Sequence, residues 1–206
     1  MRIISGFRKG KKLERPLNIR PTRDFVKEAI FNIIGSCQDL VVADVCAGSG
    51  ALGIEALSRG AKKAVFIEKD KKNCAIIQKN LRGFGNVILS ERRELRHSER
   101  SEESSHSNTQ EDPSPSTQDD RELPQDVGAV IINQPFESVA NLTADLVFFD
   151  PPYENEALYQ KIFEMNWKVK TLVIESDKPI KPPFNSSYKF KEQRKYGSTY
   201  ISLIVF

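Results

Sequence analysis

The chain is poor in histidine and cysteine. Its 206 residues include only two histidines and three cysteines. Both histidines, His97 and His106, lie in one polar segment, which argues against histidine-based nucleophilic catalysis and histidine-ligated metal sites. The three cysteines (Cys37, Cys46 and Cys74) lack metal-ligand spacing, so we predict free thiols and no metal site.

Long apolar runs are also missing. No stretch approaches the roughly 20 apolar residues of a membrane-spanning helix. The N-terminal sequence "MRIISGFRKGKK" has no apolar core of the kind found in signal peptides. We therefore expect a cytoplasmic monomer that does not associate with membranes.

Residues 91–126 differ in composition from the rest of the chain. They are rich in Ser, Glu, Asp, Pro and Gln and lack aromatic residues, a composition typical of disordered segments. They hold 5 Arg and 11 Asp+Glu, a net charge of −6, which leaves 26 basic and 17 acidic residues, or +9, elsewhere. We predict a disordered surface insert in a basic domain, and a basic domain suits a polyanionic partner. The flanking runs 85–90 and 128–133 both suit one strand position, and we assign it to the second.

Strand-like and helix-like segments alternate through the remaining sequence. This alternation predicts an α/β fold with a doubly wound, mostly parallel sheet, whose ligands bind at the carboxyl ends of the strands. The last two runs, 188–196 and 199–206, are joined through Gly197-Ser198 and predict a closing antiparallel hairpin. We divide the chain into a basic N-terminal arm, 1–20, and a domain, 21–206, interrupted by the insert. The arm either contacts the phosphates of a polyanionic partner or forms a solvated hairpin, and the sequence favours neither.

A glycine-rich turn follows the apolar run at 40–46. In "DVCAGSGALG", Gly48, Gly50 and Gly53 form a G-x-G-x-x-G pattern between a strand and a helix, the context of a nucleotide-binding turn. Glu68 ends the next strand and is placed to accept hydrogen bonds from ribose hydroxyls. The pattern fits a nicotinamide dinucleotide or S-adenosylmethionine. Asp44 favours S-adenosylmethionine, because a carboxylate repels pyrophosphate and attracts an ammonium and a sulfonium.

The segment "LVFFDPPYEN" ends a buried strand with a carboxylate held against two prolines. Asp150 and the carbonyl of Pro151 can accept hydrogen bonds from the two protons of an exocyclic amino group on a base. Pro151 and Pro152 stiffen this corner, and the ring of Tyr153 can stack on a flat base. The pattern indicates methyl transfer to a base nitrogen, a reaction that needs no histidine.

These motifs resemble the RsmD family of bacterial rRNA methyltransferases. The resemblance rests on "RIISGFRKGKKL", "RPTRDFVKEAIFNII", "AGSGALGIEALSRGA", "FIEKD", "DPPY", "IESD" and "KYGSTYISLI". It implies a Rossmann-like class I methyltransferase with a seven-stranded sheet. It also implies the cofactor S-adenosyl-L-methionine and, as substrate, the N2 amino group of a guanine in 16S rRNA or the small ribosomal subunit particle.

The resemblance also assigns roles to residues. The methionine side of the cofactor would lie against Asp44, Ala47, Gly48, Ser49, Gly50 and Gly53, the ribose against Glu68, and the target base against Asp150, Pro151, Pro152 and Tyr153. Arg20 and Thr22 fall in the family's "RPT" loop, which would cover the cofactor. One position departs from the family: Pro135-Phe136 replaces an Asp-Ala step at the adenine, where Gln134 is the substitute polar contact.

Three other functions remain open. An adenine-N6 methyltransferase shares "DPPY" and the same chemistry. A dinucleotide oxidoreductase shares the glycine pattern but is disfavoured by Asp44. A non-catalytic RNA-binding remnant would account for the insert and for Pro135-Phe136.

Overall fold

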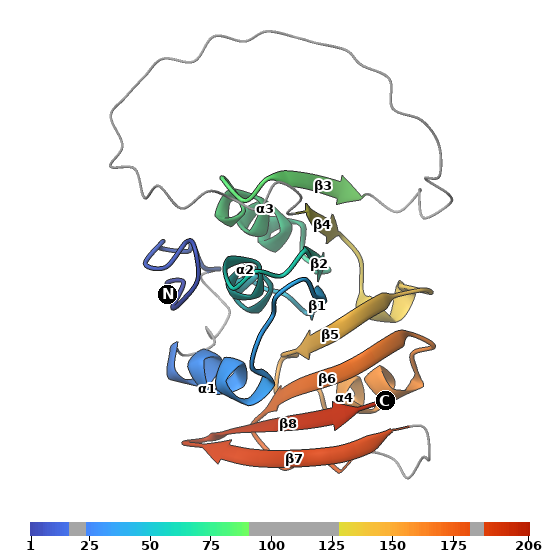
Figure 1. The fold of residues 1–206 in the computed structure, drawn as a ribbon. Helices are drawn as coiled ribbons and strands as arrows, with labels where there is room; N and C mark the ends of the chain where they lie inside the picture. Colours follow the sequence, from blue (N-terminus) through green and yellow to red (C-terminus); the bar gives the residue numbers. More distant parts are fainter. Residues whose placement is uncertain (17–23, 91–127, 182–187) are drawn as a thin grey trace, which may run out of the picture.

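One mixed sheet forms the centre of the molecule (Figure 1). The computed structural model describes residues 1–16, 24–90, 128–181 and 188–206. Eight strands follow the order β3-β4-β2-β1-β5-β6-β8-β7. They are β1 (Val41–Val45), β2 (Lys63–Ile67), β3 (Asn86–Ser90), β4 (Gly128–Ile132), β5 (Thr143–Phe149), β6 (Lys168–Ser176), β7 (Lys189–Tyr196) and β8 (Thr199–Val205).

The prediction of seven strands was wrong by one. Both runs that flank the insert are strands, and β3 pairs in parallel with β4 at the edge of the sheet. The apolar side chains of β3 have little cover, since Ile88 is 61% and Leu89 45% exposed. A β-branched run was compatible with one strand position or two, and the sequence offered no pairing information to decide between them.

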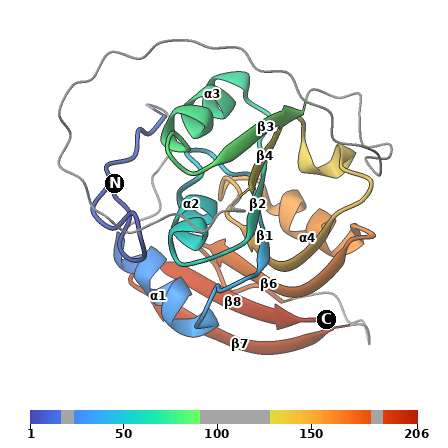
Figure 2. The same ribbon diagram turned by 45° about the horizontal axis from the view of Figure 1, so that its top comes forward.

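Helices cover both faces of the sheet (Figure 2). Buried side chains alternate along each central strand, so Val42, Phe66 and Phe148 face one core while Val45, Ile67 and Phe149 face the other. The first core also contains residues of α1 (Asp24–Ile34), α2 (Ala51–Ser58) and α3 (Lys71–Asn80). The second contains residues of α4 (Glu156–Glu164) and the short 3-10 helix η1 (Phe136–Ser138). This is the doubly wound arrangement that the alternating pattern predicted, and the antiparallel β7–β8 hairpin is also as predicted.

The described part of the N-terminal arm is a small hairpin docked on α2. The backbones of Arg2 and Lys12 form an antiparallel β-bridge, and the side chains of Ile3 and Leu13 are buried. The backbone N–H groups of Ile4 and Ser5 donate to the carboxylate of Glu55, at 2.8 and 2.9 Å. The arm therefore belongs to the same packed unit as the helices.

Glu55 is the centre of a buried charge cluster beneath the arm. Its carboxylate lies 3.3 Å from the ammonium of Lys27, and neither side chain is exposed. Arg59 donates to the same carboxylate at 2.8 Å, and Lys27 donates to the carbonyl of Arg2 at 2.5 Å. These contacts join α1, α2 and the arm through one carboxylate.

Among the described residues, no helix is both long and apolar enough to cross a membrane.

Candidate methyltransferase site

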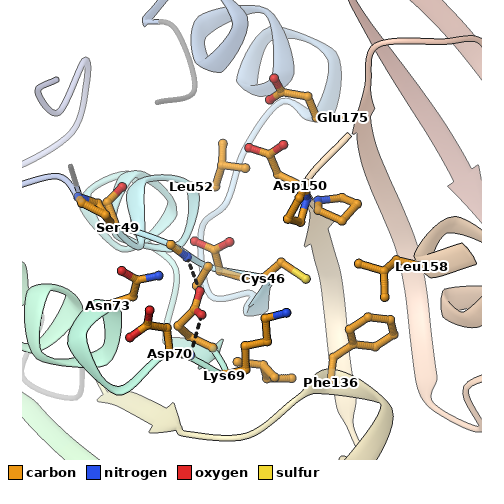
Figure 3. A pocket seen from close by; sticks show the side chains of 18 of the residues that line it. Cys46, Ser49, Leu52, Lys69, Asp70, Asn73, Phe136, Asp150, Leu158 and Glu175 are labelled. Carbon is orange, nitrogen blue, oxygen red and sulfur yellow. Dashed lines mark hydrogen bonds between the residues drawn. The ribbon is translucent and has the colours of Figure 1, made fainter. Parts of the chain in front are cut away.

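Polar residues form a row along the carboxyl edge of the parallel strands. Val45 of β1 pairs with Ile67 and Phe149, Ile67 with Ile132, and Phe149 with Ile174. The residue one position beyond each of these five therefore occupies an equivalent place on its strand: Asn133, Glu68, Cys46, Asp150 and Glu175. Four of the five, all but Asn133, line a cavity of about 800 Å³ (Figure 3). The glycine turn and the DPPY corner, about 100 residues apart in sequence, thus share one cavity, as the sequence predicted.

The glycine turn adopts a conformation that most residues avoid. Gly48 and Gly50 have φ of 56° and 74°, and Cys46 has φ of 62° without being a glycine. Gly50 is the N-cap of α2. Gly53 serves packing instead: a Cβ there would lie 2.4 Å from Cε1 of Phe66, so only glycine lets α2 approach the sheet.

Two buried carboxylates fix the turn and the start of α2 through hydrogen bonds from backbone N–H groups. Asp44 accepts a hydrogen bond from the N–H of Gly53 at 2.8 Å, and Glu68 accepts one from the N–H of Gly48 at 2.8 Å. The other oxygen of Glu68 accepts from the N–H of Asp70 at 2.8 Å. Glu68 thus has a structural role that the sequence did not predict. Its oxygens still have lone pairs that can accept further hydrogen bonds, so a ribose contact remains compatible with this arrangement.

The buried environment of Asp44 disfavours the charged form of its carboxyl group. The pKa of its carboxyl is raised from 3.8 to about 7, mainly by burial and also by the nearby charge of Glu68, while hydrogen bonds from the N–H groups of Gly53 and Leu52 act in the opposite direction. A cationic ligand beside Asp44 would stabilise the charged form.

The cavity lining is strongly acidic. Its described residues include only two bases, Arg15 and Lys69, but seven acids: Asp44, Glu68, Asp70, Glu137, Asp150, Glu154 and Glu175. Such a lining favours a positively charged ligand and disfavours a pyrophosphate.

The DPPY corner is tied to the next strand. The hydroxyl of Tyr153 donates to Oε1 of Glu175 at 2.8 Å. Burial, followed by the charge of Glu175, raises the pKa of Tyr153 far above its usual range, so its hydroxyl remains protonated and acts as a donor. The N–H of Asn155 donates to the carbonyl of Pro152 at 3.1 Å and closes the turn. Asp150, Pro151, Pro152 and Tyr153 all line the cavity.

The segment that departs from the family also reaches the cavity. Gln134, Pro135 and Phe136 line it. The ring of Phe136 also packs edge-on against Phe149 and Trp167, with ring centroids 5.3 and 6.2 Å apart. The next residue, Glu137, also lines the cavity. An acid is therefore present close to the position where the expected one is missing, and the string "QPFE" already contained it.

Asn80 links the arm to the glycine turn. Its side-chain oxygen accepts from the N–H of Glu14 at 2.8 Å, while its amide nitrogen donates to the carbonyls of Glu14, at 2.9 Å, and Ser49, at 3.0 Å. Arg15 and Pro16, the next two residues of the arm, line the cavity. The arm thus supplies part of the cavity wall.

Two basic residues of the arm are used inside the molecule. Arg8 donates to the carbonyl of Gly83 at 2.7 Å, and Lys11 donates to the carbonyls of Asn80 and Arg82 at 2.9 and 2.5 Å. These contacts satisfy carbonyl groups at and beyond the C-terminus of α3. Arg2, Lys9, Lys12 and Arg15 remain exposed.

The sequence missed several residues that line the cavity. Most of them lie close in sequence to predicted ones, and this proximity was the available signal, whereas Arg15, Pro16 and Thr199 gave none. Glu175 was expected near the site, at the end of a strand, but with a structural role. The missed residues are Arg15, Pro16, Cys46, Ala51, Leu52, Ile67, Lys69, Asp70, Asn73, Pro135, Phe136, Glu137, Glu154, Leu158 and Thr199. Ala47, Ser49 and Gly48 line the cavity as predicted. Gly50 and Gly53 shape the turn and its helix, and neither of them is part of the lining. Arg20 and Thr22 lie outside the described residues.

Comparison with solved structures defines the class. A protein of Escherichia coli described as a methyltransferase superposes with a TM-score of 0.68 and 25% identity, over 100% of this chain and 97% of that one. A protein of Haemophilus influenzae described as a methylase superposes with a TM-score of 0.63 and 26% identity, over 99% and 97%. The fold is that of a Rossmann-like methyltransferase.

Sequence comparison identifies the family. A family model described as "Conserved hypothetical protein 95" matches residues 1–113. The ribosomal RNA small subunit methyltransferase D of Haemophilus influenzae is 34% identical over 195 residues, which cover 90% of this chain and 84% of that protein. The chain belongs to the RsmD family of methyltransferases.

Other curated relatives match over a shorter span. The enzyme of the same name from Escherichia coli is 45% identical over 84 residues, which cover 39% of this chain and 42% of that enzyme. A Bacillus subtilis relative is 47% identical over 85 residues, which cover 40% of this chain and 46% of its own length. The chain thus matches less than half the length of these two relatives.

Proposed function

We propose that this protein transfers a methyl group from S-adenosylmethionine to the N2 amino group of a guanine in 16S rRNA of the small ribosomal subunit. The observation that carries the proposal is the single cavity that holds both the glycine turn and the DPPY corner. The relatives named ribosomal RNA small subunit methyltransferase D support rRNA as the substrate and, with it, a site of action in the cytoplasm.

The residues of the cavity fit S-adenosylmethionine. The ligand carries an ammonium and a sulfonium, and the acidic lining suits both. We assign the methionine portion to Asp44 and the turn Ala47–Ser49, the ribose to Glu68, and the adenine to the wall formed by Asn73, Gln134 and Glu137. Arg15 and Pro16 would close the cavity from the side of the arm. When bound, the cofactor supplies the methyl group and leaves as S-adenosylhomocysteine, while the amino group of the substrate loses one proton.

The DPPY corner would prepare the amino group for reaction. The lone pair of an exocyclic amino nitrogen is delocalised into the ring, which makes the nitrogen a weak nucleophile. The carboxylate of Asp150 and the carbonyl of Pro151 would accept hydrogen bonds from its two protons, orient the nitrogen and stabilise the positive charge that develops there. The aromatic ring of Tyr153 would stack on the base, while its hydroxyl stays bonded to Glu175.

Nucleoside analysis tests this function. The full-length protein is incubated with S-adenosylmethionine labelled in its methyl group and with either unmethylated 16S rRNA or small subunits that contain it. The RNA is then digested to nucleosides and examined by mass spectrometry. We expect labelled N2-methylguanosine, and the preferred substrate form identifies naked RNA or the assembled particle.

The same experiment separates the other functions. Labelled N6-methyladenosine would indicate the adenine enzyme. A folded protein that binds no S-adenosylmethionine by calorimetry and labels no RNA would indicate a non-catalytic remnant, and either result would overturn the proposal.

A further inference from the structure

Glu175 is the neighbour of Asp150 on the adjacent strand. Phe149 of β5 and Ile174 of β6 are paired in parallel register, and each is followed by a carboxylate. Both carboxylates line the same end of the cavity (Figure 3) and both raise the pKa of the Tyr153 hydroxyl. The base-binding end of the cavity therefore has two acids at equivalent strand positions.

The position of Glu175 is fixed by two tyrosines. Tyr153 donates its hydroxyl hydrogen to Oε1 at 2.8 Å, and Tyr159 donates its own to the backbone carbonyl of Glu175 at 3.3 Å. Glu175 is only 5% exposed, although it lies at the end of a strand in a polar cavity. Burying a carboxylate is costly, so its retention beside Asp150 is better explained by a ligand than by the packing of the sheet.

The chemistry of two carboxylates distinguishes guanine from adenine. Ionised carboxylates only accept hydrogen bonds. The Watson–Crick edge of guanine presents two adjacent donors, N1–H and the N2 amino group, and a carboxylate can accept from both. Adenine presents its amino group next to N1, whose lone pair would face the carboxylate and be repelled.

We propose that Glu175 reads the Watson–Crick edge of the target base, accepting a hydrogen bond from N1–H, and thereby selects guanine over adenine. Asp150 and the Pro151 carbonyl would orient the amino group, and Glu175 would identify the ring that carries it. This proposal rests on the proposed function, because it concerns the specificity of the same site.

The variant Glu175→Gln tests the proposal without removing the contact to Tyr153. Glutamine retains an oxygen that can accept from the Tyr153 hydroxyl, and replaces the other oxygen with an N–H donor. We expect kcat/KM on guanine-containing RNA to fall by about 10- to 100-fold, the range for a lost hydrogen bond to a charged group. The affinity for S-adenosylmethionine, measured by calorimetry, should stay within about twofold of the wild-type value.

A base analogue provides a readout that a structural role would not affect. 2-Aminopurine keeps the amino group of guanine but has a lone pair at N1 in place of N1–H. It is placed at the methylated position of a short RNA, after mass spectrometry of nuclease fragments of the labelled rRNA has located that position. The wild-type protein should strongly prefer guanine, whereas in Glu175→Gln the N–H donor faces N1 of the analogue. We expect the ratio of kcat/KM for guanine to kcat/KM for 2-aminopurine to be about tenfold or more smaller in the variant than in the wild type.

The outcomes separate the two proposals. Glu164→Gln is the matched control, because Glu164 is exposed on α4 outside the cavity and the chemical change is the same. Production of N2-methylguanosine by the wild type, with an unchanged guanine preference in Glu175→Gln, would overturn the role of Glu175 and leave the proposed function intact. Failure of the wild type to methylate guanine would overturn both.

Discussion

Asn80 holds Glu14 through both backbone groups of that residue, with hydrogen bonds of 2.8 and 2.9 Å. The same amide donates to the carbonyl of Ser49 at 3.0 Å. One side chain, 3% exposed, therefore fixes the spacing between the arm and the glycine turn. Both segments contribute to the wall of the cavity.

We predict that Asn80→Ala weakens cofactor binding more than its effect on folding explains. Three backbone groups lose their partner, which should lower the free energy of unfolding by about 2–4 kcal/mol. We expect the dissociation constant of S-adenosylmethionine to rise about tenfold or more, measured by calorimetry at a temperature where the variant is fully folded.

Gln193→Ala is the matched control for this prediction. The side-chain amide of Gln193 also donates twice, to the carbonyl of Ile180 and to the hydroxyl of Ser202, but Gln193 is half-buried and lies on β7, outside the cavity lining. It should lower stability and leave cofactor affinity unchanged. Equal loss of affinity in both variants would show that Asn80 acts through general stability alone.

Asp150→Ala should lower kcat by a factor on the order of 10²–10³, as removal of a key electrostatic contact does in other enzymes. The carboxylate is expected to act on the developing charge, so KM for S-adenosylmethionine should change little. Steady-state kinetics with labelled cofactor measure both constants. Wild-type turnover in the variant would remove Asp150 from the reaction.

Asp44 should make stability depend on pH. Its pKa is raised by burial to about 7 in the folded protein, while in the unfolded chain it stays near 3.8. Between these two values the folded state binds more protons than the unfolded state, so stability falls as pH rises. Compared with Asp44→Asn, the wild type should lose stability from about pH 4 to about pH 7 and change no further above that. Urea unfolding of both proteins across this range measures the difference, and a flat difference would contradict the prediction.

The buried pair Lys27–Glu55 should be costly to break from one side. Lys27→Met or Glu55→Gln alone leaves a charge in the interior, which should lower the free energy of unfolding by about 3–5 kcal/mol. The double variant should lose less than the sum of the two, because neither charge is then left alone. Denaturant unfolding of the four proteins gives the coupling energy, and strict additivity would show that the two side chains do not interact.

Deletion of residues 91–126 should remove one strand and leave the domain folded. β3 and β4 run parallel, with Asn86 opposite Gly128 and Ser90 opposite Ile132, so the end of β3 and the start of β4 lie at opposite ends of this strand pair. Parallel neighbours need a crossover of about a dozen residues or more, and the deletion leaves one residue between Ser90 and Gly128. We expect β4 to stay, because Ala129 and Ile131 are buried, and the exposed β3 to leave.

Two measurements check the deletion. A cooperative thermal transition should persist, and amide hydrogens of residues 86–90 should exchange faster than in the full chain. Loss of the cooperative transition would show that the domain requires the deleted residues, and unchanged protection at residues 86–90 would show that β3 remains in place.

The sequence predicted those features that arise from local patterns. The strand before the glycine turn and the terminal hairpin were both predictable from composition and turn residues. The convergence of the glycine turn and Asp150 followed from the rule that the parallel strands present their carboxyl ends at one edge. The additional edge strand, β3, could not be predicted, because pairing of exposed strands depends on long-range partners that a single sequence does not reveal.

The functional details that escaped prediction depend on register. Glu175 lies beside Asp150 only because Phe149 pairs with Ile174, and no spacing in the sequence encodes that pairing. The structural role of Glu68 depends on the backbone path of Gly48, which is 20 residues away. The contacts of Asn80 likewise join three separate segments. A sequence can suggest that such residues are functional, but only the three-dimensional structure shows which groups they contact.

The order of the strands in the chain also bears on synthesis. The glycine turn and Glu68 precede residue 70, whereas Asp150 and Glu175 come 80 or more residues after that point. β1, which carries the turn, pairs on one side with β2 and on the other with β5. A nascent chain that has released only its first 90 residues therefore has the glycine turn, Glu68 and one of the two strands that pair with β1, but lacks Gln134 and Glu137, which we assign to the adenine. The proposed position of the acceptor base forms only when β5 and β6 emerge, so under this proposal the growing polypeptide has no complete reaction site until most of its length has been translated.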